Sequence, residues 1–338
     1  MSEWNPSSEH LNFSRSEWAA LRDATPLTVD EDELSELAGR VEPITLAGVR
    51  DIYLPLSRLL NLRVEAQSKL QTTTSDFFSR DSAARPFLIG VAGSVSAGKS
   101  TTARILQAML GAWPQHPRVD LITTDGFLQP NSELEEKGLL GRKGFPESYR
   151  QGALLEFLRQ IADGAPRVSA PIYSHVTYDI TDEVQVVEQP DILIVEGLNV
   201  LQTGAPSNTP FVSDYFDFTI YVDANTEDLE SWYVERFQQL RSTAFREQSA
   251  YFSQFAHLPV DAAEAVARTI WRSINLVNLQ ENILPTRARA DLVLKKDANH
   301  EIESVQLRRI CFKLAAESAT SRSWLHYSRR SCTACSAQ

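Results

Sequence analysis

The stretch from residue 86 to residue 102 constrains the fold of this chain more than any other. It opens with an apolar run, residues 87–92, that has the length and composition of a buried strand. Residues 93–100 then match the pattern G-x-x-x-x-G-K-[ST], and the apolar residues behind them recur at the spacing of a helix packed on one side. A strand, a glycine-containing loop and a helix in this order indicate a loop that binds phosphate groups.

The residue types in this loop have a physical reason. Gly93 and Gly98 permit backbone angles and a close approach that a side chain would block, so the N–H groups of the loop and of the helix N-terminus can point at phosphate oxygens. Lys99 is then placed to reach the β- and γ-phosphates, and the Ser100 hydroxyl to bind Mg²⁺. The motif therefore predicts a protein that binds a nucleoside triphosphate together with Mg²⁺.

The bulk composition excludes several classes of partner. A formal net charge of −11 argues against nucleic acid and anionic membrane surfaces, which attract basic proteins. The sequence begins without the apolar core of a signal peptide, and no apolar run approaches the length of a membrane span. We therefore expect a cytoplasmic protein with neither a nucleic-acid nor a membrane partner.

Cysteine and histidine usage gives little indication of a metal centre or a disulfide framework. The cysteines Cys311, Cys332 and Cys335 all lie near the end of the chain. The last two form a C-x-x-C pair, which is a candidate redox or zinc motif, but the pair has no second pair to match it and lies in a polar tail. The histidines are scattered without the spacing of metal ligands.

Two acidic residues end strand-like runs. Asp125 ends a short strand that begins near residue 118, and Glu196 ends a continuous apolar run that begins near residue 190. Ligand chemistry collects at the carboxyl ends of parallel strands, so both acids are candidate functional residues, with Glu196 acting near Mg²⁺ or its bound waters. Two other interpretations stay open: Asp125 caps a turn before Gly126, and Glu196 is purely structural.

Three further features each allow two interpretations. The glycine-containing segment 128–149 carries basic residues and is either a lid or anion clamp or a solvated surface loop. The segment 171–179 mixes aromatic and hydrogen-bonding groups, which suits either a pocket for a small polar ligand or a half-buried edge strand. Arg236 lies on the apolar face of a predicted helix, and either extends its charge into solvent or is aimed at a phosphate.

Strands alternate with helices from residue 86 to residue 309, which predicts an α/β fold with a doubly wound, mostly parallel sheet flanked by helices. Residues 1–85 are expected to form a helical extension packed on this core, with a helix start at 28–37 and a long helix at 55–78. Residues 310–338 become polar and serine-rich and are expected to form a disordered tail.

The phosphate-loop motif alone does not distinguish kinases from GTPases or motors. A GTPase should carry [NT]-K-x-D, and the nearest stretch, residues 294–297, lacks the leading Asn or Thr. A small-molecule kinase needs an acid that accepts the proton of the acceptor hydroxyl, and cations that stabilise the transferred group. Asp125, Lys99 and Arg236 meet these needs.

Long stretches of the chain resemble bacterial type I pantothenate kinases. The resemblance is carried by GVAGSVSAGKSTTARILQ, VDLITTDGFLQPN, RKGFPESY, APIYSHVTYDI, QPDILIVEGLNVLQ, WYVERF and NLQENILPTRARA, and it extends over residues 12–309. It implies that residues 86–309 form a P-loop kinase domain of the phosphoribulokinase and uridine kinase superfamily. The implied reaction is the ATP- and Mg²⁺-dependent phosphorylation of pantothenate to 4'-phosphopantothenate, the first step of coenzyme A synthesis. A homodimer and feedback inhibition by coenzyme A, which competes with ATP, are also implied.

The same resemblance implies roles for individual residues. Asp125 is the implied general base, and Lys99 and Arg236 are implied to stabilise the transferring phosphoryl group. Ser100 is the implied Mg²⁺ ligand, with Glu196 nearby. The residues implied to contact the nucleotide or coenzyme A are Gly93, Ser94, Val95, Ser96, Ala97, Gly98, Lys99, Ser100, Thr101, Arg104 and His300. The residues implied to line the pantothenate pocket are Tyr173, His175, Tyr178, Tyr233, Tyr251 and Asn275.

Two alternative functions stay open. A uridine kinase or phosphoribulokinase relative would share the phosphate loop but should lack YSHVTYD and NILPTR. A non-catalytic nucleotide-binding regulator would bind ATP without turning it over. The chain also departs from the family at Leu240, where an aromatic residue is common, and in the tail after Arg309, which has no counterpart.

Overall fold

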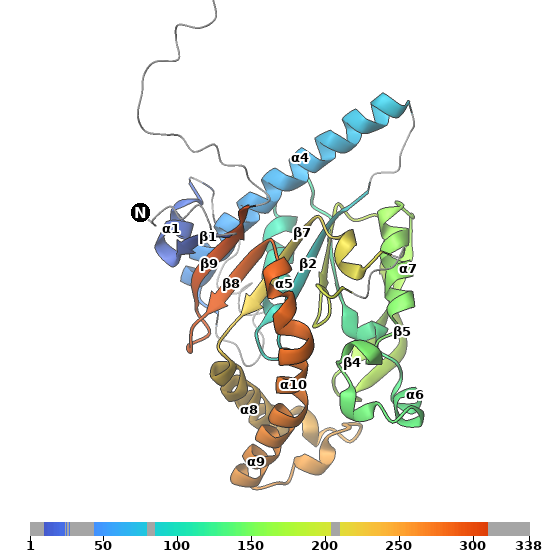
Figure 1. Cartoon of the computed structure of the whole chain (residues 1–338), viewed down its shortest axis with the longest axis vertical. Helices are drawn as coiled ribbons and strands as arrows, with labels where there is room; N and C mark the ends of the chain where they lie inside the picture. The colour runs from blue at the N-terminus through green and yellow to red at the C-terminus, as the bar shows by residue number, and fades with distance from the viewer. Residues whose placement is uncertain are drawn as a thin grey trace, which may run out of the picture.

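A seven-stranded sheet forms the centre of the computed structural model, which describes residues 10–23, 25, 27, 44–79, 85–203 and 210–309 (Figure 1). In the described chain the strand order is β1-β9-β8-β7-β2-β6-β3. The strands are β1 (His10–Ser14), β2 (Phe87–Gly93), β3 (Val119–Thr123), β6 (Ile192–Glu196), β7 (Phe218–Asp223), β8 (Leu292–Lys296) and β9 (Ile302–Arg308).

The strands at the middle of this sheet run parallel. β3, β6, β2, β7 and β8 are parallel neighbours, whereas β9 is antiparallel to β8 and β1 is antiparallel to β9. β2 and β6 are buried at every position, because a parallel sheet is covered on both faces and its strands are continuous apolar runs. The doubly wound, mostly parallel α/β fold that the sequence predicts is confirmed.

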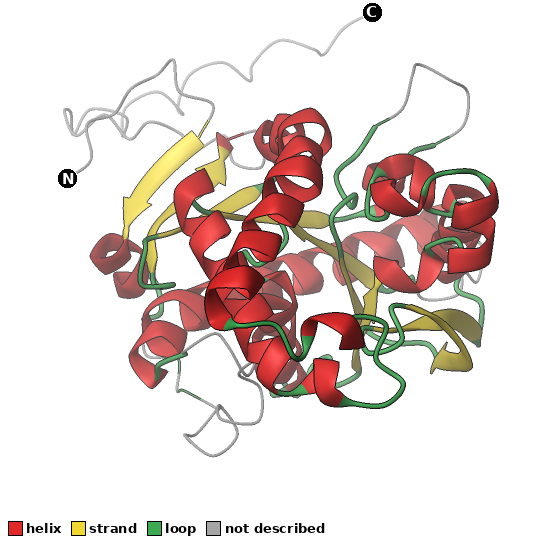
Figure 2. Cartoon of the chain, turned by 90° about the horizontal axis from the view of Figure 1, so that it is seen from below, coloured by secondary structure: helices red, strands yellow, loops and turns green. Residues whose placement is uncertain are grey.

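Alternate residues of β2 belong to separate cores. Ile89 packs in the larger core with the helices α5 (Lys99–Gly111) and α4 (Leu54–Phe78). Leu88 packs in the second core with the helix α7 (Gln151–Ala162). Helices accordingly lie on both sides of the central strands, as the view in Figure 2 shows.

The N-terminal residues supply a strand that the sequence analysis missed. β1 pairs with β9, with Phe13 opposite Val305. It leads directly into the short helix α1 (Arg15–Ala20), which Ser14 and Glu17 cap reciprocally at its N-terminus. The strand has five residues, of which only two are apolar, so its pattern is too short to be recognised by periodicity. The N-terminal extension is therefore not helical throughout.

The long helix predicted at residues 55–78 is confirmed as α4, which continues from the short helical segments Leu46–Gly48 and Val49–Tyr53. The helix start predicted at residues 28–37, the tail at 310–338 and its cysteines lie outside the described residues. The division of the chain at residues 85 and 309 stays a prediction. In the described chain no helix is both long enough and apolar enough to cross a membrane.

Two lobes extend from the sheet beyond the carboxyl ends of its parallel strands (Figure 1). One lobe holds the helix α6 (Asn131–Glu136) and the hairpin β4 (Val168–Ser174) and β5 (Asp179–Val187), and the other holds the helices α8 (Thr226–Ser242), α9 (Val260–Ile270) and α10 (Leu276–Asn278). The lobes meet where the amide N–H of Tyr251 donates to the carbonyl oxygen of Val176 at 3.0 Å.

Two of the ambiguous segments lie in the first lobe. Segment 128–149 is not loop-like throughout, because it contains α6 and two short 3-10 turns, Leu140–Arg142 and Pro146–Ser148. Segment 171–179 covers the end of β4, the hairpin turn and the start of β5. The remaining short helical segments are Thr124–Phe127, Val212–Tyr215, Ala244–Arg246, Ser253–Phe255, Trp271–Asn275, Leu279–Ile283 and Leu284–Arg289.

Candidate active site

The phosphate loop of residues 93–100 joins β2 to α5 at the carboxyl edge of the sheet. Gly93 has a φ of +146°, and a Cβ there would lie 2.5 Å from the carbonyl oxygen of Val222, so no larger residue fits. The loop also contains the hydroxyl groups of Ser94 and Ser96, which are buried without a hydrogen-bond partner. Buried polar groups normally find partners, so these hydroxyls indicate a ligand with hydrogen-bonding oxygens.

Lys99 and Glu196 form the charged centre of the site. The ammonium group of Lys99 donates to the carbonyl oxygen of Ser94 at 2.8 Å, and the Ser100 hydroxyl donates to a carboxylate oxygen of Glu196 at 2.8 Å. Burial lowers the pKa of Lys99, and the charges of Glu196 and Asp125 oppose this shift. Burial also raises the pKa of Glu196, and the charge of Lys99 opposes that shift. Each charge therefore offsets part of the effect of burial on the other.

Glu196 owes its place to strand register. It ends β6 and lies opposite Val91 of β2 and Thr123 of β3, so it reaches the carboxyl edge between the two neighbouring strands. Gly197 follows it directly, and a Cβ there would lie 1.8 Å from the hydroxyl oxygen of Thr124. The turn after β6 is thus packed against the turn that carries Asp125.

Asp125 lies in the short helical turn Thr124–Phe127 after β3. Its backbone N–H donates to the hydroxyl of Thr123 at 3.3 Å, and the phenol of Tyr149 donates to its carboxylate at 3.2 Å. The turn is also packed against β4, because a Cβ on Gly126 would lie 1.9 Å from the carbonyl oxygen of Pro171. The carboxylate therefore has a fixed place beside β4.

Arg236 of α8 faces this charged centre. Burial lowers the pKa of its guanidinium, and Tyr233, Asp125 and Glu196 oppose the shift. The effect of the two carboxylates means that the guanidinium lies within their electrostatic reach. The sequence left two interpretations open for Arg236, and its aim at a phosphate stays a prediction.

The aromatic residues expected to line a substrate pocket lie together at the hairpin turn. The ring centroid of Tyr173 is 5.2 Å from that of His175 and 6.2 Å from that of Tyr178. Tyr251 of the second lobe packs on Tyr178 at 5.1 Å. Burial lowers the pKa of His175, which keeps its imidazole neutral at pH 7 and suits it to hydrogen-bond a polar ligand.

Tyr233 and Asn275 complete this wall from the second lobe. Burial raises the pKa of the Tyr233 phenol, and a hydrogen bond with Asn275 opposes the shift. Tyr178 is also within the electrostatic reach of Tyr233, so the tyrosines of the two lobes lie near one another. The site is therefore bounded by side chains from both lobes.

His300 lies apart from the residues described so far, in the turn between β8 and β9. Its ring stacks on Trp232 at a centroid distance of 4.1 Å and an interplanar angle of 22°. Its Nδ1 is buried without a hydrogen-bond partner, as is the Nε of Arg104 on α5. The other residues expected to bind nucleotide, Val95, Ala97, Gly98 and Thr101, lie in the phosphate loop and the first turn of α5.

The sequence reasoning missed one residue of the site, Tyr149, and counted Lys143 only among the basic residues of the segment 128–149. The ammonium group of Lys143 lies 4.2 Å from the ring centroid of Tyr178 and 5.0 Å from that of Tyr173, and it donates to the side chain of Asn131 and to the backbone oxygen of Tyr178. Both residues belong to the stretch RKGFPESY, and for Tyr149 its resemblance to the kinase family was the one signal available. Their place depends on tertiary contacts that a single sequence does not encode locally.

The donor set near the phosphate loop suits a hard cation. The hydroxyl of Ser100 and the carboxylate of Glu196 are already hydrogen-bonded, and the electrostatic effect of Asp125 reaches Glu196. Oxygen ligands of this kind suit Mg²⁺, which protein sites usually hold with one or two side chains plus substrate phosphates. In the described chain no group of three or more His, Cys, Asp or Glu side chains gathers as a metal site.

Comparison with known proteins places this site in a family. A pantothenate kinase of Shewanella pealeana is 55% identical over 305 residues, which cover 89% of this chain and 96% of the relative. A pantothenate kinase of Corynebacterium glutamicum is also 55% identical over 305 residues, which cover 90% of this chain and 94% of the relative. The chain belongs to the pantothenate kinase family.

A family model and a solved structure extend the comparison. The model of the phosphoribulokinase and uridine kinase family matches residues 88–243. Among solved structures, a putative fructose transport system kinase from Silicibacter sp. is 22% identical, with a TM-score of 0.45, over 65% of this chain and 86% of that one. As a P-loop kinase the protein uses ATP.

The close packing of Gly126 leads to a prediction about stability. Gly126→Ala places a methyl group against the Pro171 carbonyl, a backbone atom that cannot rotate away. We expect the free energy of unfolding, measured in urea, to fall by about 2 kcal/mol or more, as in overpacked cores. Gly141→Ala is the matched control, because nothing lies within 4 Å of the added atom. Equal stability of the two variants would contradict the rigid placement of the Asp125 turn.

Proposed function

We propose that this protein transfers the γ-phosphoryl group of ATP to the primary hydroxyl of pantothenate, which gives ADP and 4'-phosphopantothenate, the first step of coenzyme A synthesis. The observation that carries the proposal is the convergence of Lys99, Arg236 and Asp125, all within one another's electrostatic reach, beside a wall of tyrosines. The family membership supports the choice of acceptor.

Each charged residue has a role in the proposed transfer. Asp125 takes the proton of the acceptor hydroxyl as its oxygen bonds to the γ-phosphorus and the bond to the leaving ADP oxygen breaks. Lys99 and Arg236 stabilise the charge on the transferring group. Ser100 and Glu196 would hold Mg²⁺, which when bound neutralises charge on the β- and γ-phosphates.

The neutral side chains of the site position the acceptor. We assign the pantothenate pocket to the tyrosine wall with His175 and Asn275, where apolar ring faces alternate with a few hydrogen-bonding groups. Arg104 and His300 are assigned to the nucleotide or to coenzyme A, and their unpartnered nitrogens support this role. The loop hydroxyls of Ser94 and Ser96 face phosphate oxygens.

The same proposal includes three further properties: a homodimer, inhibition by coenzyme A and a cytoplasmic location. The outer half of α4 supports the dimer, because Leu62, Leu70, Phe77 and Phe78 expose 56%, 60%, 80% and 60% of their surface. Exposed apolar side chains on one helix favour association with another copy. Light scattering measures the mass of the purified protein directly. A monomeric mass would contradict the proposed homodimer.

The substrate is tested by ADP release from Mg-ATP with pantothenate, uridine or ribulose 5-phosphate as the acceptor. We expect turnover with pantothenate alone, suppressed by coenzyme A and restored by more ATP. Turnover with uridine or the sugar phosphate would reject the assigned acceptor but keep the P-loop chemistry. ATP binding without turnover on any acceptor would indicate a non-catalytic regulator.

Asp125→Ala tests the proposed base. The phosphate loop is untouched, so ATP should still bind, whereas kcat should fall by about 10²–10⁴-fold because a positioned base contributes that much. Single-turnover measurements with pantothenate, together with equilibrium binding of ATP, separate the two effects. Near-normal turnover would remove Asp125 from this role.

Lys143 gives the reaction a pH dependence. Burial lowers the pKa of Lys143 to about 8, so its charge is present below that pH and is lost above it. Loss of the charge removes the attraction to the rings of Tyr173 and Tyr178, and kcat/KM for pantothenate should fall by up to about 10-fold as the pH rises through 8. In Lys143→Met this fall should be absent. If kcat/KM depends on pH in the same way in both proteins, Lys143 does not shape the pocket.

A further inference from the structure

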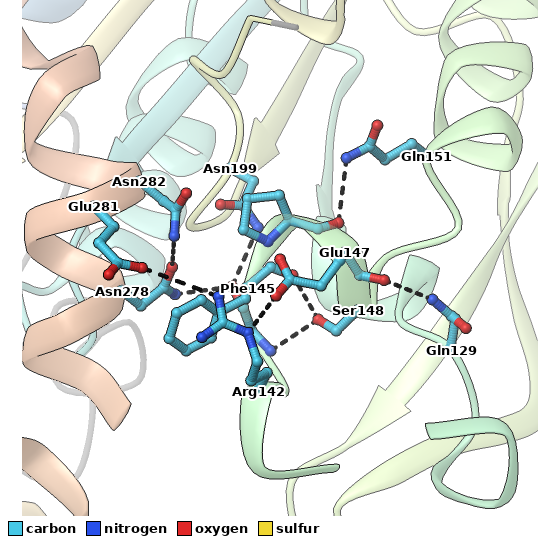
Figure 3. Close-up of polar contacts among 12 residues, drawn as sticks. Gln129, Arg142, Phe145, Glu147, Ser148, Gln151, Asn199, Asn278, Glu281 and Asn282 are labelled. Atoms are coloured by element: carbon cyan, nitrogen blue, oxygen red, sulfur yellow. Dashed lines mark hydrogen bonds and ion pairs between the residues drawn. The ribbon is translucent and has the colours of Figure 1, made fainter. Parts of the chain in front are cut away.

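Side-chain amides hold the loop that carries Lys143 and Tyr149. In Figure 3 the segment from Arg142 to Ser148 lies between a helix on one side and Gln129 and Gln151 on the other. Two amides meet at one atom, because the Nδ2 groups of Asn278 and Asn199 donate to the carbonyl oxygen of Gly144 at 2.9 and 3.2 Å. We call this pair of contacts the amide clamp.

The amide clamp joins parts of the chain that each carry a residue of the proposed site. Asn199 follows Glu196 by three positions, and Asn278 follows Asn275 by three positions. The loop itself carries Lys143, which touches the hairpin turn, and Tyr149, which donates to Asp125. One backbone oxygen therefore links three parts of the proposed site: the segment after Glu196, the segment after Asn275 and the loop that contacts Asp125.

The environment of Asn278 favours a specific orientation. The side chain is 4% exposed, and its Oδ1 accepts from the amide of Asn282 at 3.0 Å, which directs the Nδ2 toward Gly144. Gly144 has a φ of +94°, so its carbonyl points to Asn278 in a backbone conformation that residues with a side chain rarely adopt. A buried amide that satisfies both its donor and its acceptor in this way has little freedom to turn.

We propose that Asn278 is a positioning residue for phosphoryl transfer, acting with Asn199 through the Gly144 carbonyl to hold Lys143 and Tyr149 against the acceptor site. The proposal rests on the proposed function. Asn278 touches neither reacting group, so its effect passes through the loop. A displacement of about 1 Å in a positioning group can cost a hundredfold in rate, which is why such a distant amide matters.

Asn278→Asp tests the proposal, because it keeps the shape but sets a carboxylate oxygen against the Gly144 oxygen. We expect kcat with pantothenate to fall by about 10–100-fold, while the affinity for ATP stays unchanged. The matched control is Glu281→Gln on the same helix, whose side chain only approaches Arg142, at 4.0 Å, on the exposed surface. This control should stay within about 3-fold of the original, as exposed ion pairs contribute little.

A double-mutant cycle with Lys143→Met distinguishes positioning from loss of stability. If Asn278 acts through the loop, Asn278→Asp should cost clearly less in the Lys143→Met background than alone, because contacting residues couple. Additive losses would overturn the proposal. If Asn278→Asp fails to fold, the half-buried Asn199→Ala tests the same carbonyl from the other side, and unchanged kcat in that variant would also overturn it.

Limited trypsin digestion gives a readout that does not depend on activity. The clamped loop contains the exposed Arg142 and the buried Lys143, and cleavage after them should be faster in Asn278→Asp than in the unmodified protein. Equal cleavage rates would contradict the clamp. If the unmodified protein does not phosphorylate pantothenate, the proposed function fails, whereas the cleavage result still decides whether the loop is held.

Discussion

The site depends on a half-buried ammonium group that lies within the electrostatic reach of two carboxylates. Burial lowers the pKa of Lys99, and the charges of Glu196 and Asp125 oppose that shift. Glu196 is buried at the end of its strand and Asp125 is half-buried in the turn after its strand, so the sheet register places both carboxylates at one edge of the sheet.

The carboxyl edge of the sheet brings together residues that are distant in sequence. The phosphate loop, the Asp125 turn and Glu196 follow adjacent strands, and they form the base of the site. The two lobes supply the walls: the hairpin brings Tyr173 and Tyr178, and α8 brings Arg236. The sheet edge thus carries Lys99, Asp125 and Glu196, whereas the lobes carry the tyrosines and Arg236. This division explains how one sheet architecture can accept different substrates.

Local sequence patterns predicted the residues at the carboxyl edge of the sheet, whereas tertiary contacts determined the other residues of the site. The phosphate loop could be recognised because its glycines, Lys99 and Ser100 are contiguous, and Asp125 and Glu196 because each ends an apolar run. The direction of Arg236 could not be predicted, since an apolar helix face does not say what lies opposite it. Lys143, Tyr149 and Asn278 work through contacts with distant backbone, and β1 was missed because only two of its five residues are apolar.

The strand β1 has a consequence for how the chain folds during synthesis. Its partner β9 is the last strand of the sheet, and the ion pair between Arg15 and Glu301 links positions 286 residues apart. The first strand must therefore wait, unpaired, until nearly the whole kinase domain has left the ribosome. Because β9 is synthesised so late, β1 can join the sheet only near the end of synthesis. Pairing between such distant segments is non-local, which slows folding. Once formed, β1 covers a strand edge that would otherwise be open to pairing with another chain.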